Sequence, residues 1–179
     1  MIRIVPYDDR WPDQFASEAS QLRAAMGSLS LRIEHVGSTS VPGLAAKPVI
    51  DIQTSVATLD GLDVYVAPLA SLGYSHVPFG DVDRVYPFFR KPAAWPSTHH
   101  LHLCVIGSEQ ERRHLAFRDY LRNHPQIANE YVALKRSLAA THIGATAESR
   151  ERYSLAKTEF VTSIERQALS VYPSSVDWS

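Results

Sequence analysis

Two segments of the chain alternate between apolar and polar side chains with the period of two that is typical of a β-strand. In residues 49–56, VIDIQTSV, the two rows are Ile50, Ile52, Thr54, Val56 and Val49, Asp51, Gln53, Ser55. In residues 98–106, THHLHLCVI, the rows are Leu101, Leu103, Val105 and His100, His102, Cys104. If the two strands share a sheet, one face packs on helices and the opposite face carries a row of acid, amide and imidazole groups.

This polar row has two interpretations. Antiparallel sheets commonly expose one face to solvent, so the row could be an ordinary solvent-exposed surface. A wet surface usually carries Lys, Glu and Thr, however, whereas Asp, Gln and His are the types that bind metals or move protons. A further strand predicted over residues 31–36 would add His35 to the row. Cys104 alternates with core positions, and we expect it to be buried and inert.

The rest of the chain predicts mainly helices. A stripe of Phe15, Ala19, Leu22 and Met26 predicts a helix that stops at Gly27, and residues 60–72 predict another. Residues 2–5 predict a short strand, and residues 74–79 and 84–90 predict a strand pair. Residues 109–170 predict three helices with breaks near residues 124–125 and 142–144. We therefore expect one α+β domain over residues 1–179.

Composition excludes several classes of function. The net charge of −1 provides no strong field to attract duplex nucleic acid or an anionic membrane. A single cysteine excludes an intrachain disulfide and a four-cysteine metal site. The first residues do not resemble a secretory signal, and no apolar run is long enough to cross a membrane. The expectation is a cytoplasmic protein without a membrane partner.

The Gly37–Ser38 pair precedes Asp51 by a short loop. A glycine lets a phosphate approach the backbone, and the following amides and serine hydroxyl can bind its oxygens. An aspartate on the adjacent strand could then hold a divalent cation against that phosphate. A tight turn followed by an ordinary buried strand would explain the same residues.

Three segments resemble the GrpB-like family of the nucleotidyltransferase superfamily: HVGSTSVPGLAAKPVIDI, FRDYLRNHPQIANEYVALKRSLA and YSLAKTEFV. The resemblance implies a nucleotidyltransferase-like small mixed β-sheet with helices packed on one face, an open active face and a helical carboxyl-terminal third. Gly37 and Ser38 match the Gly-Ser position of the superfamily, and Asp51 matches its first acid. The family also occurs fused behind dephospho-coenzyme A kinase, which hints at nucleotide or coenzyme metabolism.

The chain departs from the superfamily pattern at the other acids. Gln53 stands at the second acid position, and the later strand offers His100 and His102 where a third carboxylate is usual. Two-metal transfer relies on carboxylates, and Mg²⁺ prefers oxygen ligands, whereas imidazole suits zinc, iron, manganese or nickel. We expect a divalent metal, Mg or Mn with Zn, Fe or Ni as alternatives. Its candidate ligands are Asp51, His100, His102 and His35, with Asp51 and His102 also the catalytic candidates.

Cationic and polar residues outside the strands are candidates for binding phosphate or nucleotide. On the turn and strand entrance these are Gly37, Ser38, Thr39 and Lys47, and beyond them Arg84, Arg118, Tyr153 and Lys157. Lys135 could join Arg118 and Lys157 in a wall opposite the sheet. Each of these charges is equally compatible with a solvated helix or edge-strand surface.

Three functions remain open from the sequence. The first is a nucleotidyltransferase-like enzyme acting on a nucleotide or another phosphorylated small molecule. The second is a non-catalytic module that binds a nucleotide or coenzyme, which the missing second acid favours. The third is a transition-metal-dependent hydrolase built on Asp51 and the three histidines.

Overall fold

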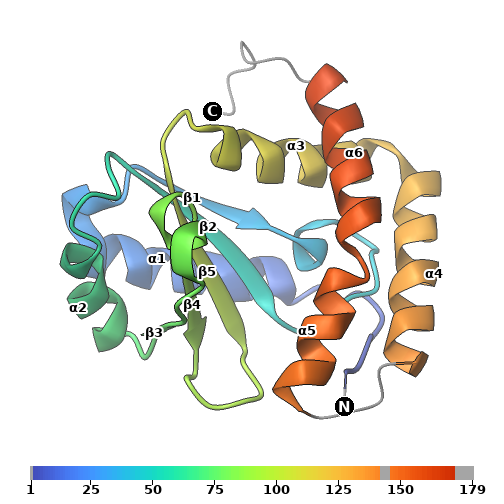
Figure 1. The fold of residues 1–179 in the computed structure, drawn as a ribbon, viewed down its shortest axis with the longest axis horizontal. Helices are drawn as coiled ribbons and strands as arrows, with labels where there is room; N and C mark the ends of the chain where they lie inside the picture. Colours follow the sequence, from blue (N-terminus) through green and yellow to red (C-terminus); the bar gives the residue numbers. More distant parts are fainter. Residues whose placement is uncertain (1, 142–145, 172–179) are drawn as a thin grey trace.

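A five-stranded mixed sheet in the order β1-β2-β5-β4-β3 is the framework of the fold. The computed structural model describes residues 2–141 and 146–171 (Figure 1). The strands are β1 (Arg32–Val36), β2 (Ile50–Val56), β3 (Ser75–His76), β4 (Phe88–Lys91) and β5 (His99–Val105). The helices are α1 (Trp11–Met26), α2 (Asp63–Ser71), α3 (Glu109–Asn123), α4 (Pro125–Thr141), α5 (Ala147–Leu155) and α6 (Thr158–Val171). Short 3-10 turns are η1 (Gly27–Leu29), η2 (Ser38–Ser40) and η3 (Gly80–Arg84).

The two alternating segments are parallel neighbours in the sheet. Asp51 is level with His100, and Gln53 is level with His102. Because partners in register point to the same face, the predicted row of acid, amide and imidazole groups is confirmed. All other strand pairs are antiparallel.

One face of the sheet packs on α1 and α2, as expected. The core between them contains apolar side chains of both predicted strands, among them Ile50, Ile52, Leu101 and Leu103. His35 also points to this face, because β1 pairs with β2 so that His35 is level with Ile52 and not with Asp51. Its ring stacks on Phe15 of α1 with 4.8 Å between ring centroids. The predicted place of His35 in the polar row is therefore wrong.

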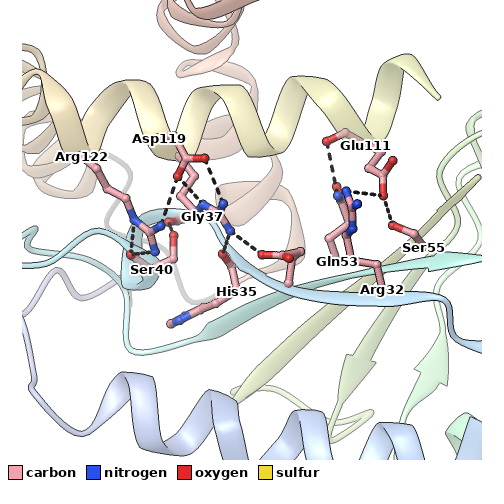
Figure 2. A network of polar contacts seen from close by, with 11 residues as sticks. Arg32, His35, Gly37, Ser40, Gln53, Ser55, Glu111, Asp119 and Arg122 are labelled. Atoms are coloured by element: carbon pink, nitrogen blue, oxygen red, sulfur yellow. Dashed lines mark hydrogen bonds and ion pairs between the residues drawn. The ribbon is translucent and has the colours of Figure 1, made fainter. Parts of the chain in front are cut away.

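The opposite face is largely covered by α3, so it is less open than the resemblance implied. Figure 2 shows α3 on one side of the sheet and α1 on the other. Ser55 donates a hydrogen bond to the Glu111 carboxylate, and Gln53 Nε2 donates to the Glu111 carbonyl at 3.4 Å. Cys104 is fully buried here, and burial raises the pKa of its thiol to about 12. Asp51, His100 and His102 of the row stay partly exposed, and the side chains of Asp51 and His100 are exposed by 30% and 26%.

The carboxyl-terminal part is helical, as predicted. Apolar side chains of α3, α4 and α6 form a second core with Val41 and Leu44 of the loop after η2, and α4, α5 and α6 stand together at the right of Figure 1. Arg113 of α3 donates to Glu165 of α6 at 2.5 Å. The predicted break at residues 124–125 is confirmed, and the one at residues 142–144 lies outside the described residues.

Other differences from prediction are local. The single last helix expected after the break near residues 142–144 is interrupted after Leu155, and Lys157 lies between α5 and α6. The predicted strand over residues 2–5 is only a bridge between Val5 and Ala46. The predicted strand pair is present as the shorter β3 and β4. None of the helices in the described part of the chain is both long and apolar enough to cross a membrane.

Candidate functional site

Three of the four lysines in the chain line one pocket of about 190 Å³ beside the Gly37–Ser38 turn. We call it the lysine pocket. Its lining residues are Gly37, Ser38, Lys47, Val49, Asp51, His100, Tyr131, Lys135, Tyr153, Ser154 and Lys157. They come from the turn after β1, from η2, from the start of β2 and the loop before it, from the start of β5, from α4 and α5, and from the junction of α5 with α6. The pocket therefore lies where the helical third of the chain meets the exposed end of the polar row.

Gly37 allows the turn to pass directly over Asp51. Its φ is +67°, a conformation that costs an L-residue free energy. A side chain at this position would also collide with the Asp51 carboxylate, and its Cβ would lie 2.9 Å from the Asp51 Cβ. The predicted proximity of the Gly-Ser turn to Asp51 is thus present, and it depends on the absence of a side chain at residue 37.

Helix α3 holds this turn from the other side. Arg122 donates to the Ser40 carbonyl at 2.8 Å, and Ser40 Oγ donates to the Gly37 carbonyl at 2.6 Å (Figure 2). Arg118 Nη1 donates to Glu34 Oε2 at 2.7 Å and to the His35 carbonyl at 3.2 Å. Asp119 accepts from both arginines.

Arg118 was predicted to bind phosphate, but the structure uses it to join α3 to β1. Its guanidinium is buried, its charge is balanced by Glu34 and Asp119, and it does not line the lysine pocket. Arg84 lies on the exposed turn η3 beside Asp81 and is also away from the pocket. Thr39 is buried and donates to the Val49 carbonyl at 3.2 Å, so its hydroxyl holds the loop together.

Lys135 is the most deeply buried cation of the pocket, with 2% of its surface exposed. Its Nζ donates to the Ala45 carbonyl at 2.6 Å and to Ser38 Oγ at 3.0 Å, and it lies 4.6 Å from the centre of the Tyr131 ring. Burial, with the nearby charge of Lys157 as a further cause, lowers the pKa of Lys135 to about 7. An anion in the pocket would offset both causes.

Lys47 and Lys157 approach the same aromatic ring. Their Nζ atoms lie 4.1 Å and 4.7 Å from the centre of the Tyr153 ring. Burial lowers the pKa of Lys157, although Asp51 opposes the shift. Tyr153 is fully buried, burial raises the pKa of its phenol, and its hydroxyl has no hydrogen-bond partner within the described residues. The pocket thus concentrates cations with a polar group that a ligand could satisfy.

Asp51 is the only acid among the described residues that line the pocket. Burial alone would raise its pKa, but the hydrogen bond with His100 and the charges of His100, His102 and Lys157 together lower it. His100 Nδ1 lies 3.1 Å from Asp51 Oδ1. Asp51 is therefore ionised near neutral pH, and with His100 it forms the one predicted acid–imidazole pair that reaches the pocket.

The predicted set of four metal ligands is not assembled. His35 lies on the other face, where burial lowers its pKa to about 4. His102 is half-buried against Tyr86 and Phe88, with ring centroids 4.4 Å and 4.8 Å away, and desolvation lowers its pKa to about 3. Within residues 2–141 and 146–171, no three His, Cys, Asp or Glu side chains are grouped to hold a metal ion. The residues that the structure describes thus assemble neither a transition-metal centre nor a two-metal carboxylate site.

A single magnesium ion shared with a ligand is compatible with this arrangement. Mg²⁺ is usually bound by one or two carboxylates together with substrate phosphates and water. Asp51 can supply one such carboxylate, because it lies at the accessible end of the row and borders the pocket.

The sequence prediction of the site included seven residues that line this pocket, and their roles stay predictions: Gly37, Ser38, Lys47, Asp51, His100, Tyr153 and Lys157. It did not select Tyr131 and Ser154, and it mentioned Lys135 only as part of a wall. The available signal was helical spacing, since Tyr131 and Lys135 are four residues apart on α4 and share a face.

Comparison with known proteins agrees with the resemblance seen in the sequence. The model of the family described as "GrpB protein" matches residues 1–167. A crystal structure of conserved protein GrpB from Enterococcus faecalis superposes with a TM-score of 0.83 at 37% identity, covering 95% of this chain and 99% of that one. UPF0157 protein YqkA of Bacillus subtilis (strain 168) is 34% identical over 93% of this chain.

Some relatives are longer than this chain. The match spans 47% of the length of YqkA. A protein named dephospho-CoA kinase, from Mycolicibacterium paratuberculosis (strain ATCC BAA-968 / K-10), is 35% identical over 76% of this chain, and the match covers 39% of that protein. The shared segment is thus less than half of either relative.

Proposed function

Because this chain belongs to the GrpB family, we propose that the lysine pocket binds a phosphorylated small molecule and that Asp51 binds one divalent cation together with its phosphate. The observation that carries the proposal is the convergence of Lys47, Lys135 and Lys157 on the turn of Gly37. The chain has only one lysine outside the pocket, Lys91, which pairs with Glu18, and its other Lys or Arg positions are all arginine.

The charge of the pocket favours an anion. Three lysines face one carboxylate, and desolvation lowers the pKa of both Lys135 and Lys157. Hydrogen bonds to an ionised group in a partly buried site are roughly twice as strong as neutral ones. A phosphate that accepts from Lys135, Lys157 and Ser38 would supply those bonds.

The arrangement also supports a single metal ion over two. Asp51 reaches the pocket, but Gln53 is buried under α3 and bound to the Glu111 carbonyl. A second cation would have no carboxylate at that position. The name dephospho-CoA kinase among the relatives adds support for a nucleotide-related ligand.

Calorimetric titration tests the proposal directly. Inorganic phosphate or ribose 5-phosphate is titrated into the protein, with and without Mg²⁺ at about 5 mM. We expect saturable binding that Lys157→Met weakens at least about tenfold, which corresponds to about 1.4 kcal/mol. Arg84→Gln removes a cation outside the pocket and should leave the affinity unchanged. Equal losses in the two variants, or no binding of either ligand, would contradict the proposal.

Catalysed transfer is the second candidate, and the Asp51–His100 pair favours it. An imidazole held by a carboxylate can accept a proton from an attacking hydroxyl. Turnover of nucleoside triphosphates with Mg²⁺ or Mn²⁺, measured as pyrophosphate release, should then be abolished by His100→Gln. Binding without turnover in the wild-type protein would instead identify a non-catalytic binding module.

A further inference from the structure

A second pocket adjoins the lysine pocket. It has a volume of about 320 Å³ and is lined by Ile2, Arg3, Lys47, Pro48, Val49, Trp95, Pro96 and Ser97. We call it the Trp95 pocket. Lys47 and Val49 line both pockets, so the segment at the entrance of β2 is their common wall. A ligand held by its phosphate in the lysine pocket could extend over this wall.

The two pockets differ in chemistry. Indole, proline and aliphatic groups dominate the Trp95 pocket, whereas amines and hydroxyls dominate its neighbour. Trp95 is 36% exposed and belongs to the segment between β4 and β5. Flat faces of this kind suit an aromatic ring, because stacking on an aromatic side chain is favourable for every nucleobase.

One buried polar group in the Trp95 pocket indicates that its occupant is not purely apolar. Ser97 is only 4% exposed, and its Oγ has no hydrogen-bond partner within the described part of the chain. Buried hydroxyls are nearly always hydrogen-bonded in native proteins, so a partner supplied by a ligand would explain this one. An aliphatic chain could not satisfy it, but the polar edge of a heterocycle could.

We propose that the phosphorylated ligand is a nucleotide, with its base in the Trp95 pocket and its phosphate in the lysine pocket. This inference rests on the proposed phosphate site and adds the class of compound and a second set of binding residues. Trp95 provides the stacking surface, Ser97 hydrogen-bonds the base, and Lys47 lies between base and phosphate. A sugar phosphate would fill only the lysine pocket.

The test compares AMP, GMP, CMP and UMP with ribose 5-phosphate by calorimetry on the full chain. We expect at least one nucleotide to bind about tenfold more tightly than ribose 5-phosphate. Trp95→Leu should remove that advantage and leave ribose 5-phosphate binding unchanged. Phe79→Leu, which alters another exposed aromatic residue away from both pockets, should change neither affinity.

Ser97→Ala distinguishes a hydroxyl that binds the ligand from one that only supports the fold. Because its Oγ has no hydrogen-bond partner among residues 2–141 and 146–171, removing it should not lower the free energy of unfolding, yet it should weaken nucleotide binding several-fold. Lower stability with unchanged nucleotide affinity would count against a role in binding.

The two proposals fail in different ways. If ribose 5-phosphate binds and no nucleotide binds better, the phosphate site stands and the base site is wrong. If nucleotides bind better but Trp95→Leu retains the whole advantage, the base lies elsewhere and the inference is again overturned. If neither nucleotides nor ribose 5-phosphate bind, both proposals are wrong.

Discussion

Replacing Gly37 by alanine should destabilise the protein through a contact that only the folded chain makes. Gly37 has a φ of +67°, and an added Cβ would lie 2.9 Å from the Asp51 Cβ. The Asp51 Cβ cannot easily move, because it is fixed to the backbone of β2, which is paired on both sides with β1 and β5. Relief of the clash therefore requires the turn itself to shift.

The expected magnitude has two parts. The backbone conformation of Gly37, a positive φ with an extended ψ, costs an L-residue about 1–3 kcal/mol. Adding a methyl group to a packed contact typically costs about 1–3 kcal/mol more. Gly43→Ala is the matched control, because Gly43 has a φ of +76° and its Cβ would meet no atom within 4 Å. Gly43→Ala should thus lose only the backbone part, and Gly37→Ala should be less stable than it by about 1–3 kcal/mol.

Equilibrium unfolding in urea, followed by circular dichroism, measures this difference. The two variants should have the same denaturant dependence as the wild type and different midpoints. Gly37→Ala should also bind ribose 5-phosphate more weakly, because a displaced turn moves Ser38 away from Lys135. Equal destabilisation of the two variants would refute the close approach of Gly37 to Asp51.

Three further predictions concern titrating groups. Affinity for ribose 5-phosphate should fall by up to about tenfold per pH unit above pH 7, because Lys135 has a pKa of about 7 in the free protein and must be protonated to bind phosphate. Calorimetry on Lys135→Met should show a much flatter profile, and an unchanged profile would exclude Lys135 as the cause. Asp51→Asn should remove any effect of Mg²⁺ on the affinity for ribose 5-phosphate. It should also strengthen binding without Mg²⁺, because the described lining of the pocket loses its one carboxylate charge. A persisting Mg²⁺ effect in the same titration would place the cation elsewhere. The pKa of His102 is about 3 in the folded state, below the unfolded value of about 6.5. Its contribution to the free energy of unfolding is therefore complete above pH 6.5 and falls by about 2–3 kcal/mol by pH 4.5. Urea titrations at both pH values should show a smaller loss for His102→Phe, and an equal loss would assign the acid sensitivity to other groups.

The part of the site that lies on strands followed from the sequence. Alternation along a strand is set by local geometry, so Asp51 and Gln53 had to share a face, as did His100 and His102. The expectation that the two strands join their polar rows was confirmed by their parallel register. The glycine at position 37 was also a local signal, since a turn that approaches another chain segment excludes a side chain.

The position of His35 shows where local patterns stop being sufficient. Its strand was predicted correctly, but its face depends on the register between β1 and β2. A shift of one residue reverses every side chain of a strand, and the sequence of a single strand does not contain that register. His35 consequently packs on Phe15 of α1 instead of joining Asp51.

Tertiary structure alone decided which helix charges reach the pocket. Lys135, Lys157 and Arg118 all lie on or between helices of the carboxyl-terminal part, and nothing in their local sequence distinguishes a pocket cation from one that pairs with an acid. Packing of α3 across the sheet buries Gln53 and pairs Arg118 with Glu34, while α4 and the junction of α5 with α6 direct two lysines toward Ser38 and Tyr153. Alternation along a strand determines which side chains share a face. Helices are placed by long-range burial of apolar surface, and that placement brought Lys135 and Lys157 to Lys47.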